Sequence, residues 1–203
     1  MTNITKSLFE RLNWRPNVLT FLQMLILLAV YPAVKYANPQ WFFEDGIVEN
    51  IQLAICLCCF MAAWFAPRDK ALFRFFALVI ILIIFREIST GRHWLCAYYN
   101  LPQESKWKDI PYGLVLYWGR NLFAIFTFVY FLWHKVYKSL WQYIKKAPIF
   151  VWEFLFLAAG VILALLAEKP IDNEIMEEMA ETLFYLALFN LIWRYEYSKL
   201  SLN

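Results

Sequence analysis

Eight of the 16 acidic residues lie in three segments that are far apart in the sequence and border apolar runs: three at 44–49, one at 86–93 and four at 174–181. Carboxylates can act as a general acid and a general base, or they can bind a divalent cation. The middle segment also contains arginines, whose guanidinium groups bind phosphate through parallel hydrogen bonds. These residue types indicate the binding or modification of a charged group in apolar surroundings.

The acids of the first and third segments fall on helix faces. One stripe, at the helical spacing i, i+4, i+7 and i+11, consists of Asp45, Glu49, Gln52 and Cys56. A second stripe, at i, i+4 and i+8, consists of Glu177, Glu181 and Tyr185. The rest of the first run is apolar, so we expect its stripe to face the interior of a helix bundle.

Three of the acids, Glu49, Glu87 and Glu181, are the strongest candidates for catalysis or metal binding, because ionisable residues inside a membrane are functional by default. Glu87 lies at the C-terminal end of its predicted helix, where the helix dipole disfavours a carboxylate. Glu181 lies too far from the start of its helix for the helix dipole to stabilise its carboxylate. The candidates for binding a phosphate, or for pairing with these acids, are Arg86, Arg92 and Arg120.

Two chemistries can use this cluster. In the first, oxygen ligands and one imidazole bind a divalent cation such as Mg, Mn or Zn. The metal ligands would then be Asp45, Glu49, Glu177, Glu181 and His93. In the second, no metal is present and paired carboxylates share a proton. Asp45 and Glu177 also have an interpretation without function, because both lie near helix N-termini, where the helix dipole stabilises a carboxylate. Arg120 has one as well, since its long side chain can extend to the membrane interface instead of binding a phosphate or an acid.

The elements that position these residues are predicted to be membrane-spanning helices. Hydrophobic residues make up 62% of the 203 residues and charged residues 17%, against roughly 45–50% and 25% in soluble chains. This composition excludes soluble globular and disordered proteins. Six continuous apolar runs approach or exceed the roughly 20 residues that cross a bilayer, which predicts an all-α bundle of six transmembrane helices. The runs are 17–36, 46–66, 71–88, 111–134, 149–168 and 177–195.

The distribution of lysine and arginine predicts the orientation, because cytoplasmic segments of membrane proteins are enriched in both. One side of the predicted bundle carries 12 of the 19 basic residues. These are Lys6, Arg11, Arg15, Arg68, Lys70, Arg74, Lys135, Lys138, Lys145, Lys146, Arg194 and Lys199. We therefore expect both termini to be cytoplasmic and the acidic segments to lie at the outer face. The net charge of +3 follows from this topology and does not indicate nucleic acid binding.

The segment 135–147 has a pattern of its own. Its apolar residues recur at helical spacing, and lysines occupy much of the remaining surface. This favours a helix that lies on the cytoplasmic headgroups, although the segment could also simply extend the fourth span. Residues 1–203 are expected to form a single transmembrane domain.

The three acidic segments also resemble a known group of proteins. The matching residues are Glu44-Asp45-Gly46-x-x-Glu49, Arg86-Glu87-Ile88-Ser89-x-Gly91 and Glu177-Glu178-x-x-Glu181. They resemble a loosely defined group of uncharacterised bacterial multispan inner-membrane proteins, with Arg86 in place of a glutamate and Arg92-His93 in place of Gln-Arg. The resemblance implies the same choice of residues and a bacterial cytoplasmic membrane, and it implies no substrate.

Three functions fit these observations. The leading hypothesis is an outer-leaflet site that recognises or modifies a lipid or lipid-linked headgroup, with or without a divalent cation. The second is a non-enzymatic accessory subunit, or a homo-oligomer, whose charges are structural ion pairs. The third is a small ion- or proton-coupled transporter, which crowding of the acids at one face disfavours. The expected partners are membrane lipids, with a membrane protein under the second hypothesis.

Overall fold

The computed structural model describes residues 9–42, 46–90, 95–96, 98–102 and 105–197. Within these residues the fold is all-α. The long helices are α2 (Val18–Tyr36), α3 (Ile47–Trp64), α4 (Lys70–Thr90), α6 (Gly113–Trp133), α8 (Val151–Leu166) and α9 (Glu174–Glu196). The shorter elements are α7 (Val136–Lys146), η1 (Pro39–Trp41), η2 (Trp107–Asp109), the π-helical turn η3 (Ala167–Ile171), β1 (Leu12–Asn13) and β2 (Ile149–Phe150). Each predicted apolar run thus forms a helix, with its ends close to those expected.

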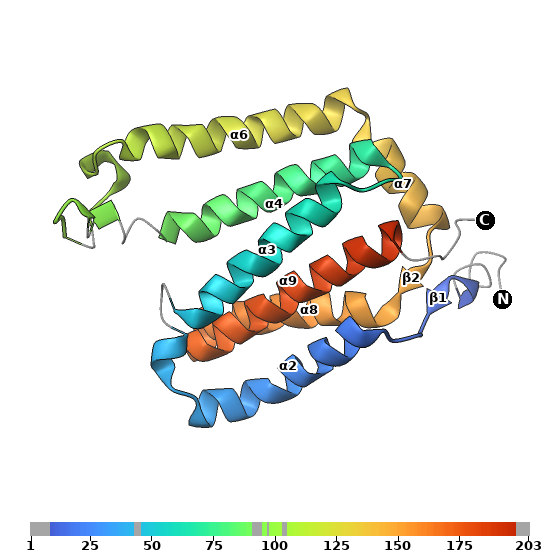
Figure 1. Ribbon diagram of the computed structural model, residues 1–203, viewed down its shortest axis with the longest axis horizontal. Helices are drawn as coiled ribbons and strands as arrows, with labels where there is room; N and C mark the ends of the chain where they lie inside the picture. Colours follow the sequence, from blue (N-terminus) through green and yellow to red (C-terminus); the bar gives the residue numbers. More distant parts are fainter. Residues whose placement is uncertain (1–8, 43–45, 91–94, 97, 103–104, 198–203) are drawn as a thin grey trace.

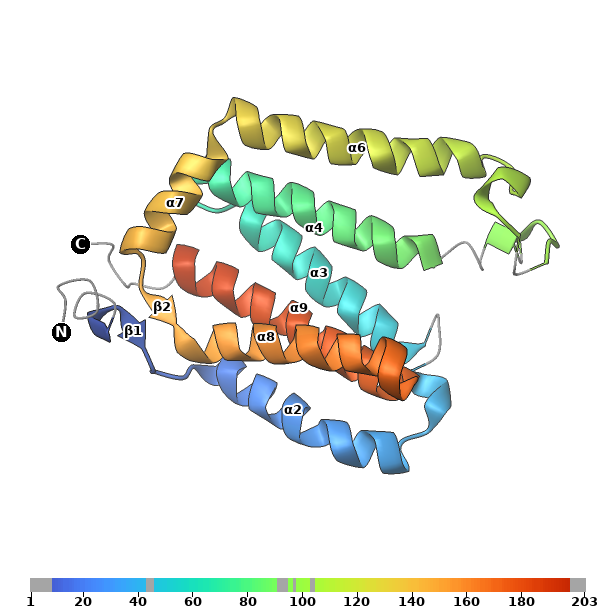
Figure 2. The same cartoon turned by 180° about the vertical axis from the view of Figure 1, so that it is seen from behind.

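The long helices lie side by side and run between two ends of the molecule (Figures 1 and 2). α6 forms one edge, followed by α4, then α3, then the closely packed pair α9 and α8, with α2 at the other edge. We name one end the α7 end; it contains β1, β2, α7 and the connection between α3 and α4. We name the other the η1 end; it contains η1, η2, η3 and the N-terminal ends of α3 and α9.

Local sequence signals explain where several helices begin and end. Asn17 caps α2, because its side chain accepts a hydrogen bond from Thr20 N at 2.8 Å and Asn17 N donates to Thr20 Oγ1 at 3.0 Å. Lys135 has a left-handed backbone with φ 52°, which α-helices of L-residues do not continue through. The helix expected at 135–147 is therefore separate from α6, and the alternative of one continuous helix is wrong.

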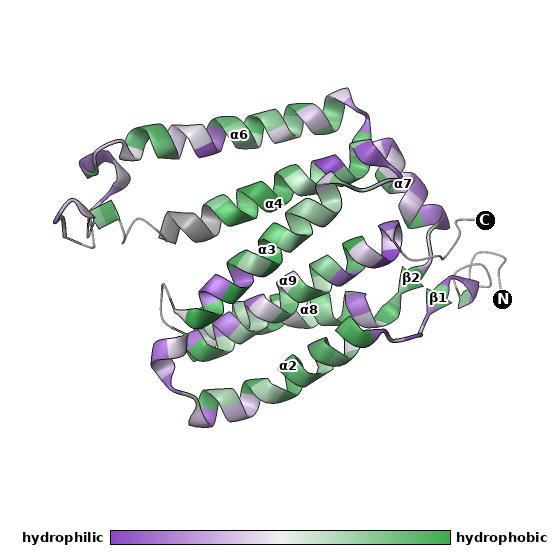
Figure 3. Ribbon diagram, viewed as in Figure 1, coloured by the Kyte–Doolittle hydropathy of each residue, from purple (hydrophilic) through white to green (hydrophobic). Residues whose placement is uncertain are grey.

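Among the described residues, four helices are long and apolar enough to cross a membrane. They are Val18–Tyr36, Ile47–Trp64, Gly113–Trp133 and Val151–Lys169. α4 and α9 are equally long but contain more charged residues, which lie mostly near their ends. Figure 3 shows hydrophobic residues along the middle of the long helices and hydrophilic ones at the two ends and on α7. The helices indicate a membrane protein.

α9 is the most buried of the long helices, and it packs against α8, α3 and α2. Small residues allow the closest of these contacts, since Gly160 of α8 and both Ala180 and Ala187 of α9 are buried. Close packing of small residues is a common way to hold helices together in a membrane. The position of α9 therefore determines where the acidic residues of its first turns lie.

Candidate functional site

The N-terminal turns of α3 and α9 meet at the η1 end through one fully buried side chain, Gln52 of α3. Its Nε2 donates to Glu178 Oε2 and to Glu178 O, both at 2.8 Å, and lies 3.2 Å from Thr182 Oγ1. Two turns further along α3, Cys59 Sγ donates to Tyr185 O at 3.6 Å. The two predicted polar stripes therefore lie along the same helix–helix contact, and we name this cluster the α3–α9 site.

The remaining acids of the α3–α9 site lie on the same turns of the two helices as Gln52 and Glu178. Glu49 precedes Gln52 on α3, and Glu177 and Glu181 lie beside Glu178 on α9. All of these carboxylates are half-buried and none is without a partner. In the part of the chain that the structure describes, the Oε1 atom of Gln52 has no hydrogen-bond partner, although it is buried. The site thus combines several carboxylates with a buried acceptor that could receive a hydrogen bond.

Of the other predicted site residues, Arg120 lies on a helix away from the α3–α9 site, and the side chains of the rest lie outside the described part of the chain. Arg120 lies on α6 with its guanidinium carbon 5.7 Å from the centroid of the Tyr117 ring, and α6 packs on α4, α7 and η2. Arg120 therefore lies on the α4 side of the bundle and not beside α9. Arg86 and Glu87 belong to the last turns of α4, but their side chains lie outside the described part. Asp45, Arg92 and His93 also lie outside the described residues.

No group of three His, Cys, Asp or Glu side chains is arranged to bind a metal ion within the described residues. Two of the five predicted ligands, Asp45 and His93, lie outside that part of the chain. The predicted divalent-cation site, which includes those two residues, stays a prediction.

A second polar cluster at the α7 end was not predicted. Glu153 lies in the first turn of α8 and is completely buried. Its Oε1 accepts hydrogen bonds from Arg194 Nη1 at 2.6 Å, Thr20 Oγ1 at 2.8 Å and Asn190 Nδ2 at 3.1 Å. Arg194 also donates from Nη2 to Arg15 O at 3.0 Å. We name these residues the Glu153 network.

The Glu153 network joins α2, from the N-terminal part of the chain, to the consecutive helices α8 and α9. Asn17 at the start of α2 and Asn190 of α9 exchange hydrogen bonds of 2.7 Å and 3.2 Å through their side-chain amides. The guanidinium carbon of Arg194 lies 4.1 Å from the centroid of the Phe150 ring. Oε1 of the buried carboxylate accepts from a guanidinium and two neutral donors, while Oε2 has no partner among the described residues. The pairing with Arg194 favours a structural clamp between α2, α8 and α9.

Among the described residues, the α3–α9 site and the Glu153 network lie at opposite ends of the bundle. In the Glu153 network the carboxylate is completely buried and paired to an arginine. The α3–α9 site is more accessible, because its carboxylates are only half-buried. Comparison with protein-family models, with curated proteins and with solved structures finds no match to the chain. Its function is therefore inferred from the geometry of these two clusters.

Proposed function

We propose that the chain is a six-span protein of a bacterial cytoplasmic membrane, in which the α3–α9 site recognises or modifies the headgroup of a lipid or lipid-linked molecule. In this proposal α4 and α9 also cross the membrane, and the α7 end with both termini faces the cytoplasm. The concentration of lysine and arginine at the α7 end supports this orientation. The α3–α9 site then lies at the depth of the outer headgroups.

The observation that carries the proposal is the α3–α9 site itself. Half-buried carboxylates of α3 and α9 lie in the same helix turns as the buried Gln52, whose Oε1 has no partner among the described residues. Buried polar atoms are almost always hydrogen-bonded, so a donor group of a bound molecule could satisfy this acceptor. Hydroxyl and amine groups of a lipid headgroup are donors of this kind, and neighbouring carboxylates would accept further hydrogen bonds from them.

The arginines complete the proposed site. α4 packs directly against α3, and Arg86 lies in its last turns at the η1 end. A guanidinium there would bind the phosphate that links a headgroup to its lipid. Glu49 and Glu181 would then hold the headgroup itself, and Glu87 would act as an acid or base.

Glutamine substitutions test the site, because they remove the charge and keep the shape of the side chain. In membranes extracted with mild detergent, Glu49→Gln and Glu181→Gln should lower the copurification of one lipid headgroup class about tenfold, as expected for loss of one charge-assisted hydrogen bond. Mass spectrometry of the copurified lipids measures this. The matched control is Glu168→Gln, at an exposed glutamate of η3 at the same end.

Two results would contradict the proposal. If both site variants copurify the same lipids as the parent chain, the carboxylates do not bind a headgroup. If they instead lower the amount of protein in the membrane, and charge-reversed partners restore it, the carboxylates are structural ion pairs.

A further inference from the structure

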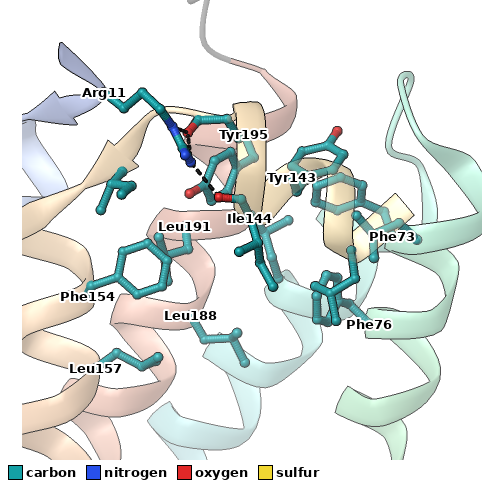
Figure 4. A pocket seen from close by; sticks show the side chains of 15 residues that line it. Arg11, Phe73, Phe76, Tyr143, Ile144, Phe154, Leu157, Leu188, Leu191 and Tyr195 are labelled. Carbon is teal, nitrogen blue, oxygen red and sulfur yellow. Dashed lines mark hydrogen bonds between the residues drawn. The ribbon is translucent and has the colours of Figure 1, made fainter. Parts of the chain in front are cut away.

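An apolar cavity of about 470 Å³ lies at the α7 end, away from the α3–α9 site. It is bounded by α4 on one side and α8 on the other, with α9 at its back and α7 across its end (Figure 4). The side chains that face each other across it include Phe73 and Phe76 of α4, Phe154 and Leu157 of α8, and Leu188 and Leu191 of α9. Its volume is typical of ligand sites, which are about 300–1,000 Å³.

The lining of the cavity determines what can fill it. The cavity is partly open at the surface and its walls are almost entirely apolar, so covering them with an apolar group is more favourable than leaving them in water. An apolar group is therefore expected inside. Along α9 the lining residues run from Leu188 to Tyr195, which is about 10 Å at 1.5 Å per residue. That length suits part of an extended alkyl chain that runs parallel to the helices.

The rim of the cavity is positively charged. Arg11 is the only charged residue among the described ones that line it. Its Nε and Nη2 donate to Ala147 O at 3.0 Å and 2.7 Å, and Nη2 also donates to Ile144 O at 2.6 Å. No described residue accepts a hydrogen bond from Nη1. Burial raises the pKa of Tyr143, also at the rim, to about 12, so this phenol adds no charge.

α7 adds further positive charge next to the rim. Its residues Leu140, Tyr143 and Ile144 line the cavity, while its lysines are exposed. These lysines are Lys138, Lys145 and Lys146, and the helix contains no acidic residue. A helix with one apolar and one basic face is typical of the surface of a membrane with anionic lipids.

We propose that this cavity binds one acyl chain of an anionic phospholipid, whose phosphate is held at the rim by Arg11, while the exposed lysines of α7 attract anionic lipids to this end of the protein. The lipid belongs to the leaflet at the α7 end. The cavity supplies the apolar contacts, and the rim supplies the preference for negative charge. This lipid site at the α7 end is separate from the α3–α9 site, and the proposal does not depend on the function proposed for the α3–α9 site.

A photoreactive phosphatidylglycerol with a diazirine in one acyl chain tests the proposal. The full-length protein is reconstituted in phosphatidylcholine vesicles that contain this probe, and crosslinked peptides are identified by mass spectrometry. We expect crosslinks to the lining segments of α8 and α9. Unlabelled phosphatidylglycerol should compete for them about tenfold better than phosphatidylcholine. Equal competition by the two lipids would overturn the proposed preference for anionic headgroups.

A pair of matched substitutions on α8 tests the cavity. Leu157→Trp places a large side chain inside it and should lower crosslinking to its walls about tenfold. Leu165→Trp makes the same change on the same helix at a position that is 60% exposed and does not line the cavity, so it should leave crosslinking unchanged. Parental crosslinking in the Leu157→Trp protein would overturn the proposal, and so would an absence of wall crosslinks in the parent.

Failure of this proposal can be told apart from failure of the proposed function. Glu181→Gln lies at the η1 end and should leave the crosslinking pattern of the cavity unchanged. The competition experiment on the parent protein also needs no variant, so it gives a result even if Leu157→Trp does not fold.

Discussion

Replacing Glu153 with leucine is expected to lower the free energy of unfolding by about 3–5 kcal/mol, the usual loss when one partner of a buried ion pair is removed. The substitution leaves the guanidinium of Arg194, which is only 7% exposed, without its carboxylate. It also removes one of the two acceptors of Thr20 Oγ1 and of Asn190 Nδ2, and leaves each of them with Asn17 Oδ1. Unfolding in mixed micelles with increasing SDS, followed by tryptophan fluorescence, measures the change.

A double variant measures the interaction energy between Glu153 and Arg194, apart from the contacts that each residue makes with others. Arg194→Met alone should also destabilise the protein, because it leaves Glu153 charged and buried. In Glu153→Leu with Arg194→Met no buried charge remains, so the combined loss should be smaller than the sum of the single losses by about 0.5–3 kcal/mol. Glu168→Leu, at an exposed glutamate, is the control and should change stability by less than about 0.5 kcal/mol. Strictly additive losses would show that the two residues do not stabilise the fold as a pair.

The helices of this fold could be predicted from the sequence because their signals are local. Each long helix corresponds to a continuous apolar run, and α2 and α9 each begin after an asparagine that caps them. α7 was predicted as a separate helix because its apolar spacing and its lysines set it apart from α6. The left-handed backbone at Lys135 had no local sequence signal, since lysine does not favour that conformation.

The polar contacts between helices could be predicted only in part. The stripe that contains Gln52 was expected to face the bundle interior, and Gln52 is indeed buried. Its partner is Glu178, which the spacing placed beside the second stripe and not on it. The rotation of one helix about its axis relative to another depends on side-chain packing, and periodicity alone does not determine it.

The Glu153 network shows a second limit of the sequence. Glu153 lies in the first turn of α8, where the helix dipole favours a carboxylate, so its position in the sequence does not distinguish it from an ordinary helix-start acid. Its importance comes from Thr20 and Arg194, which are far away in sequence and converge on it. Arg120 gives the opposite result, since its place in a predicted span suggested a central role and the structure places it on an edge helix.

Replacing Gly160 with leucine is expected to separate α8 from α9. A Cβ atom at this position would lie 2.9 Å from Phe184 Cβ and 3.0 Å from both Ala180 O and Phe184 N. Two of these atoms belong to the backbone of α9 and cannot move independently of the helix. Overpacking usually costs about 1–3 kcal/mol, so we expect Gly160→Ala to lie at the lower end of that range and Gly160→Leu at or above the upper end. Unfolding with increasing SDS, as for Glu153→Leu, measures the loss of stability of both glycine variants.

Gly119 of α6 provides the matched control, because no atom lies within 4 Å of a Cβ built there. Gly119→Leu should therefore cause no loss of stability. Gly160→Leu should also affect the α3–α9 site, since Ala180, against which Gly160 packs, precedes Glu181 on the same turn of α9. If the proposed function is correct, Gly160→Leu protein that still reaches the membrane should lose the same lipid class as Glu181→Gln. Equal stability of the Gly160→Leu and Gly119→Leu proteins would contradict the close contact, because a tight helix pair cannot accept four extra carbon atoms without moving apart.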